Sequence, residues 1–108
     1  MHRIRISRPG DYSALSYVEV ETPEPGPGEV VIAAVACGVN YADGIIRMGL
    51  YESAKKLHGY PITPGFEVAG RVAAIGEGVE RFAIGDEVIG LTLFNGYASH
   101  LKLGVDGV

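Results

Sequence analysis

Few side chains in this sequence combine a reactive group with a neighbour that could activate it. Cys37 is the single cysteine, and its small, apolar, glycine-flanked surroundings favour an inert buried thiol over a nucleophile. His58 and His100 have no carboxylate or serine at a spacing typical of catalysis. One cysteine cannot close a disulfide within the chain or supply a cysteine-rich metal site. The sequence therefore excludes a disulfide-stapled scaffold and a zinc lobe with several cysteines.

Two polar side chains could act on a ligand. Asn40 stands between an apolar segment and a helical pattern, so its amide can cap the helix, face a ligand, or do both. Tyr51 carries a phenol that can bind a carbonyl oxygen or deliver a proton, and the alternative is an aromatic anchor for a loop. The glycine-rich segment 76–81 lacks a third glycine and precedes a strand pattern. It therefore does not predict a dinucleotide-binding turn.

The elements that must position these residues are mostly strands. Alternating or continuous apolar patterns bounded by glycine and proline predict six of them. Residues 30–36 are uniformly apolar, which favours a strand buried on both faces. The expected strands cover residues 3–7, 16–22, 30–36, 67–75, 86–93 and 97–103.

One short helix is expected between Asn40, which can cap it, and Gly49, which can end it. Residues 50–64 have no clear periodicity and are expected to form a loop over a site. No segment has the dozen helical residues of a parallel crossover. The fold class is therefore mainly β, a barrel or sandwich.

Length and charge restrict the classes of protein and partner. The chain has 108 residues, a length typical of one domain, and 16 of them are Gly. The formal net charge is -4 and the basic residues are scattered, so nucleic acid is not an expected partner. No apolar run is long enough for a signal peptide or a membrane span. A cytoplasmic location is expected.

The most specific segment is Gly65-Phe66-Glu67-Val68-Ala69-Gly70, followed by Gly76-Glu77-Gly78-Val79 and Gly85-Asp86-Glu87-Val88. Here the chain resembles the N-terminal catalytic domain of the medium-chain dehydrogenase/reductase superfamily. Further motifs fall in the same order and at similar spacing, so the resemblance covers nearly the whole chain. They are Pro25-Gly26-Pro27-Gly28-Glu29-Val30, Cys37-Gly38-Val39-Asn40-Tyr41-Ala42-Asp43, Gly49-Leu50-Tyr51 and Pro61-Ile62-Thr63-Pro64-Gly65.

Within the superfamily the chain is most similar to the quinone oxidoreductase branch, which includes homologues of the vesicle amine transport protein. The resemblance implies a GroES-like, partly open β-barrel with one or two short helices over residues 1–108. It also implies a Rossmann cofactor domain after residue 108. The expected reaction is hydride transfer from NADPH to a quinone, an enone or a similar conjugated carbonyl acceptor, with the chemistry supplied by the cofactor. The 108 residues alone are expected to be inactive.

The resemblance separates this chain from the zinc alcohol dehydrogenases. Their catalytic metal is held by a Cys at the position of Asn40 and by a His at the position of Phe66. A phenyl ring has no lone pair to offer and a neutral amide is a poor zinc ligand. No zinc and no metal-ligating residue are therefore expected.

The resemblance also implies roles for single residues. Tyr51 matches a tyrosine whose hydroxyl enters the active site, and is the expected catalytic residue. Asn40 is expected to face the nicotinamide and its ribose. Phe66 is expected to form a wall of the substrate pocket, with Tyr41 a weaker candidate for lining it.

Asp43 and Glu67 align with carboxylates beside the metal of the zinc enzymes. A buried carboxylate needs a partner, so a structural role is expected, through bonds to backbone amides or to Arg47.

Two alternatives remain: a free-standing GroES-like binding or interaction module, and a zinc-dependent alcohol dehydrogenase with an altered metal site. Without a second domain, several apolar side chains would be uncovered, so the isolated chain is expected to self-associate. A homo-oligomer with a small-molecule substrate is expected. The uncovered side chains are Leu50, Phe66, Leu91, Leu93 and Phe94.

Overall fold

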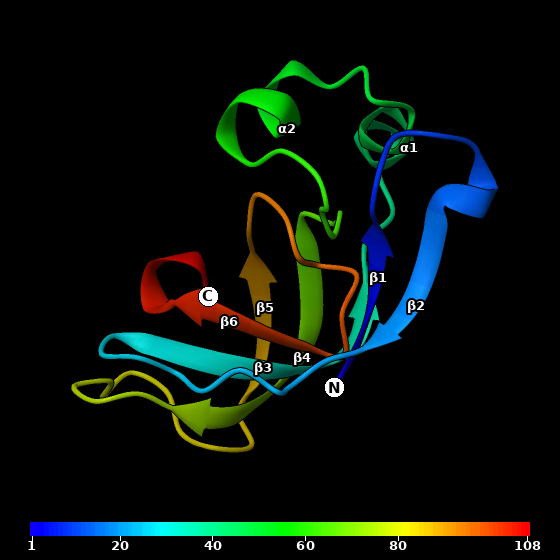
Figure 1. Ribbon diagram of the computed structural model, residues 1–108. Helices are drawn as coiled ribbons and strands as arrows, with labels where there is room; N and C mark the ends of the chain where they lie inside the picture. Colours follow the sequence, from blue (N-terminus) through cyan, green and yellow to red (C-terminus); the bar gives the residue numbers. More distant parts are fainter.

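The computed structural model describes all 108 residues and consists of two antiparallel sheets with two short helices (Figure 1). The smaller sheet pairs β1 (His2–Ile6) with β2 (Leu15–Glu19). The larger sheet has the order β5-β4-β3-β6. Its strands are β3 (Glu29–Cys37), β4 (Glu67–Ile75), β5 (Glu87–Leu91) and β6 (His100–Gly104). The sheets do not close, and the mainly β, GroES-like partial barrel predicted from the sequence is confirmed.

The helices α1 (Tyr41–Met48) and α2 (Glu52–Leu57) lie beyond the same end of the strands (Figure 1). Gly49 ends α1 in the left-handed conformation at φ 81°, as its position predicted. The expectation of a loop over residues 50–64 is wrong in part, because α2 forms there. Single 3₁₀ turns occupy Tyr12–Ala14 and Val105–Gly107. Neither helix is long and apolar enough to cross a membrane.

Two hydrophobic clusters hold these elements. The first joins β1 to the helices and contains Ile6, Ile46, Ala54, Ile62 and Phe94. The second is formed by residues of β3, β4 and β6 and contains Val30, Ile32, Val68, Val72 and Leu101.

Three burial expectations are corrected by the structure. Only the first half of β3 is buried, since Val35 is 81% exposed on a face of the sheet that no element covers. Cys37, at the end of the same strand, is exposed and not buried. Phe94 was expected to be uncovered, but it is 6% exposed because it belongs to the first cluster.

The β3–β4 pair depends on a glycine. A Cβ added to Gly70 would lie 2.1 Å from the carbonyl oxygen of Ala33. The pair changes register between Ala34 and Ala36, next to this contact. Gly70 therefore allows the two backbones to approach where the sheet bends.

Candidate functional site

The candidate site lies at the end of the β3–β4 pair that faces the helices. Cys37 and Val68 are the last paired residues, and the N–H of Gly38 donates to the carbonyl of Glu67 at 3.1 Å. Asn40 follows this point on one strand and Phe66 precedes it on the other. The two positions on which the expectation of no zinc rests are therefore brought to the same end of the β3–β4 pair.

Gly38 and Glu67 pack against each other there. A Cβ on Gly38 would lie 2.0 Å from Oε1 of Glu67, so only a glycine leaves room for this carboxylate. The Glu67 side chain thus packs across Gly38, but it makes neither of the bonds expected for it, to a backbone amide or to Arg47.

Asn40 is fixed by a buried carboxylate. Its N–H donates to Oδ2 of Asp43 at 2.9 Å, and the N–H of Asp43 donates to the carbonyl of Asn40 at 3.0 Å. Asp43 is 5% exposed, whereas Asn40 is exposed. The start of α1 thus presents Asn40 outward on a rigid turn.

Asp43 has a second partner that the sequence did not indicate. The hydroxyl of Tyr97 donates to Oδ2 of Asp43 at 2.6 Å across 54 residues of sequence. The expected contact with a backbone amide is present, but the alternative partner Arg47 is wrong. Arg47 instead donates to the carbonyl of Gly10 at 2.7 Å, and its guanidinium lies over the ring of Tyr12.

The pKa of Tyr97 is raised well above its ordinary value. Burial is the largest cause, followed by the hydrogen bond to Asp43 and the charge of that carboxylate. The hydroxyl therefore keeps its proton and remains a donor to Asp43 across the physiological pH range. Together, Tyr97 and Asp43 connect the segment before β6 to the turn that carries Asn40.

The other predicted residues form an aromatic cluster. The Tyr51 and Phe66 rings meet edge to face at 6.3 Å between centroids. Phe66 also lies 6.1 Å from Phe94, whose other neighbour is His58 at 5.6 Å. Tyr51 precedes α2 and is partly buried, so its ring is anchored by packing. This packing is what the alternative of an aromatic anchor predicts, and the catalytic role of Tyr51 stays a prediction.

Tyr41 is placed differently. It begins α1 and is 88% exposed. Like Asn40, Tyr51 and Phe66, it lines none of the hollows described below. The predicted places of Tyr41 and Phe66 in the substrate pocket stay predictions.

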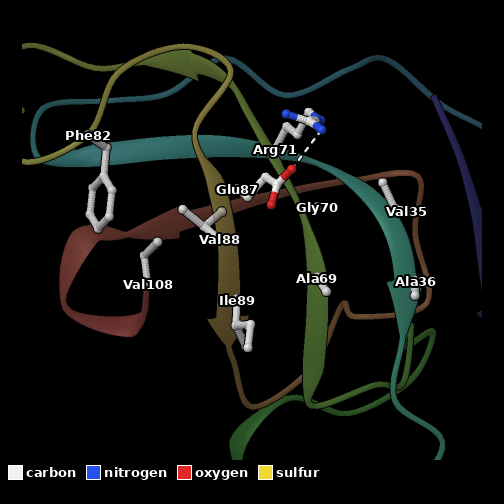
Figure 2. Close-up of a pocket in the computed structure, with 10 residues that line it drawn as sticks. All are labelled: Val35, Ala36, Ala69, Gly70, Arg71, Phe82, Glu87, Val88, Ile89 and Val108. Carbon is white, nitrogen blue, oxygen red and sulfur yellow. Dashed lines mark hydrogen bonds and ion pairs between the residues drawn. The ribbon is translucent and has the colours of Figure 1, made fainter.

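The largest hollow lies on the open face of the sheet and has a volume of about 740 Å³ (Figure 2). Side chains from β3, β4 and β5 form its floor, with Phe82 and Val108 at one end. Its single ion pair joins Arg71 and Glu87 at 2.8 Å. Val35 and Ile89, 81% and 65% exposed, make the rest of the face apolar.

A second hollow of about 400 Å³ shares Ala36, Ala69 and Ile89 with the first. Its other lining residues include Cys37, Gly38 and Glu67. The two hollows thus form a groove that runs along the open face and ends beside the candidate site.

No three His, Cys, Asp or Glu side chains come together in a way that could hold a metal ion. The donor set at the end of β3–β4 consists of an amide at position 40, an exposed thiol at 37 and a carboxylate at 67.

The partly open barrel, with its helices at one end and a groove on its open face, defines the chain as a GroES-like domain. The sequence matches the family "Alcohol dehydrogenase GroES-like domain" over residues 26–107. The chain therefore belongs to this family, within the medium-chain dehydrogenase/reductase superfamily.

The relatives it resembles are oxidoreductases and related proteins. A probable quinone oxidoreductase of Schizosaccharomyces pombe is 40% identical over 93% of this chain and 29% of its own. The crystal structure of the human synaptic vesicle membrane protein VAT-1 homolog-like protein is 32% identical, with a TM-score of 0.91 over 99% of this chain and 33% of that one. The quinone oxidoreductase of Escherichia coli complexed with NADPH is 30% identical, with a TM-score of 0.89 over 99% and 32%. The chain thus spans about a third of the length of these relatives.

Proposed function

We propose that this chain is the substrate-side domain of an NADPH-dependent, zinc-independent oxidoreductase that reduces quinones, enones or similar conjugated carbonyls. The observation that carries the proposal is the placement of Asn40 and Phe66 just beyond the same end of the β3–β4 pair, with Phe66 packed against Tyr51. The Schizosaccharomyces pombe relative and the Escherichia coli structure bear the name quinone oxidoreductase, and the second was solved with NADPH.

The residues at the edge of the sheet fit the nicotinamide end of such a cofactor. Asn40 is exposed beside Val39, which is 80% exposed. An amide next to an uncovered apolar side chain matches a flat ring that carries a carboxamide. When bound, NADPH supplies a hydride to the acceptor.

The residues of this chain would orient the acceptor and complete its reduction. The Tyr51 hydroxyl would donate a hydrogen bond to the acceptor's carbonyl oxygen and supply the proton that this oxygen requires. Phe66 would form an apolar wall beside it and help to exclude water. Asp43 and Tyr97 would hold the turn of Asn40 in place.

We propose that the site binds no zinc, because of the chemistry of the side chains at the two ligand positions. Phe66 cannot ligate a metal, and the amide of Asn40 is a poor zinc ligand. The zinc-dependent alternative predicts stoichiometric metal in the purified protein, so metal analysis separates the two.

We propose that the cofactor domain follows residue 108 in a longer protein. A glycine-rich turn between a strand and a helix should be encoded downstream of Val108. A stop codon there would favour the alternative of a free-standing binding module. We propose a cytoplasmic location for the longer protein, as the sequence led us to expect.

The apolar groove also supports association between copies of the isolated chain. β5 is an edge strand, and the side chains of two of its own residues, Ile89 and Leu91, are 65% and 61% exposed. An open strand edge next to an apolar face favours pairing with a second copy. We expect two copies to meet through β5 and the groove.

The test of the proposed mechanism is a Tyr51→Phe substitution in the complete enzyme. Loss of a positioned proton donor typically lowers a rate by about 10²–10⁴-fold, so we expect kcat to fall within that range while NADPH affinity is kept. Tyr60→Phe is a matched control, since Tyr60 packs against the same cluster and its hydroxyl donates to the carbonyl of Ile46. Unchanged turnover in Tyr51→Phe would remove this residue from the mechanism.

A further inference from the structure

Two arginines of β1 differ from the other arginines of the chain in having a buried side-chain nitrogen without a partner. Only Arg71 takes part in an ion pair, with Glu87, so Arg3 and Arg5 have no acidic partner. The Nε atoms of both are buried and have no hydrogen-bond partner. A guanidinium cannot lose its charge to avoid this cost. The terminal nitrogens of Arg3 and Arg5 are not buried and have no partner within the chain, so they are the atoms that an acceptor from outside can reach.

Two connected hollows surround these side chains. The first has a volume of about 120 Å³ and is lined by Arg3, Arg5, His58, Thr63 and Asn95 among others. The second, of about 210 Å³, shares Arg3 and Asn95 with it. Lys102 and His100 line this second hollow. We call the two together the basic groove.

The basic groove has a charge opposite to that of the whole chain. The formal net charge is -4, yet no Asp or Glu lines either hollow. Single-sign charge within a recess focuses the local potential, so anions are attracted here although the rest of the molecule repels them.

Neutral donors complete the groove. Thr63 is 3% exposed and lines the first hollow with its hydroxyl group available as a donor. Asn95 is held in the left-handed conformation at φ 77°, with its N–H donating to the carbonyl of Thr63 at 2.8 Å. Its side-chain amide lines both hollows.

We propose that the basic groove binds a phosphate group through the guanidinium groups of Arg3 and Arg5, with Thr63 and Asn95 as further donors. The planar donor fork of arginine matches the oxygens of phosphate and forms paired, charge-assisted hydrogen bonds. The first hollow is far smaller than the roughly 300–1,000 Å³ of pockets that enclose whole small molecules. The site would therefore take a phosphate or pyrophosphate group and leave the rest of a larger ligand outside. It includes none of Asn40, Tyr51 and Phe66, and it adjoins the candidate site only through His58, which packs on Phe94 of the aromatic cluster.

The experiment is calorimetric titration of the 108-residue chain with inorganic pyrophosphate at constant ionic strength. We expect saturable binding at one site, weakened at least about tenfold by Arg3→Gln and by Arg5→Gln, because each removes charge-assisted hydrogen bonds. Arg5→Lys, which keeps the charge and loses the fork, should also weaken binding. Arg81→Gln is the matched control, since Arg81 lies over the ring of Phe82 outside the groove and carries the same charge.

Three results would overturn the proposal: no saturable binding, an equal loss of affinity in Arg81→Gln, or equally tight binding of citrate, which would assign the groove to carboxylates. Amide chemical shifts of the unsubstituted chain provide a test that does not depend on variants that fold. Pyrophosphate should shift the amide signals of Arg3, Arg5, Thr63 and Asn95. Shifts confined to other residues would contradict the proposal.

Discussion

The hydrogen bond between Tyr97 and Asp43 gives the sharpest prediction about stability. Tyr97→Phe removes a hydroxyl that donates at 2.6 Å to a carboxylate that is 5% exposed. Oδ1 of this carboxylate is already buried without a partner, so Oδ2 would keep only the N–H of Asn40. A hydrogen bond to a charged group contributes about 1.5–3 kcal/mol. We expect the variant to lose about 2 kcal/mol, or about 10 °C in Tm for a domain of this size.

Thermal and urea unfolding followed by circular dichroism measure this loss, and the chain offers two graded controls. Tyr60→Phe removes a hydroxyl that donates to a neutral carbonyl, that of Ile46, and should cost about 1 kcal/mol. Tyr17 is 72% exposed and its ring stacks on His2, so Tyr17→Phe should change little. If Tyr97→Phe lowered the free energy of unfolding no more than Tyr17→Phe does, the buried carboxylate of Asp43 would not anchor Tyr97, and the reasoning would be refuted.

The raised pKa values of two tyrosines predict how the stability of the chain depends on pH. Burial and Asp43 raise the pKa of Tyr97 above its ordinary value of 10.0, and burial raises the pKa of Tyr60 in the same direction. The unfolded chain therefore releases these protons first as the pH rises. The stabilisation is fully present below pH 10.0 and is lost progressively above it. Tyr97→Phe should make this alkaline loss shallower, and an equally steep loss in the variant would contradict the assignment.

Three further predictions concern the sheet, its open face and the metal. Gly70→Ala should lower the free energy of unfolding by about 1–3 kcal/mol, because the new Cβ would meet the carbonyl of Ala33. Gly104→Ala is the control: its Cβ would enter open space, so the loss of stability should be far smaller. Ile89→Lys should reduce the self-association that light scattering detects at high concentration. Ile84→Lys, which lies outside the groove, should leave self-association unchanged. An unsubstituted chain that is monomeric at high concentration would contradict this prediction. Elemental analysis of the purified protein should find no stoichiometric zinc, and its presence would favour the zinc-dependent alternative.

Much of the fold follows from local sequence signals. The pattern of residues 67–75 predicted β4 with the bounds that the structure has, because glycine turns flank an alternating strand. Asn40 and Gly49 predicted the ends of α1 by their capping chemistry. α2 was missed since it has only six residues and its N-cap, Tyr51, has no side-chain cap bond.

Burial was harder to predict because it depends on what covers a face. The run 30–36 is uniformly apolar, yet Val35 lies on an open face, and no local pattern distinguishes it from buried Val31. Cys37 is exposed for the same reason, since no element covers the end of β3 where it lies. At the candidate site, the sequence indicated Asp43 but not Tyr97, since nothing in the local pattern joins residues 54 positions apart.

The central claim is that this domain serves NADPH-dependent reduction of conjugated carbonyls. The most direct test is to express the complete reading frame that contains residues 1–108 and to follow NADPH oxidation with a quinone as acceptor, in the presence of a metal chelator. We predict quinone-dependent oxidation of NADPH that the chelator does not reduce, and none with the 108-residue chain alone. No quinone-dependent oxidation by the complete protein, or activity abolished by the chelator, would contradict the claim.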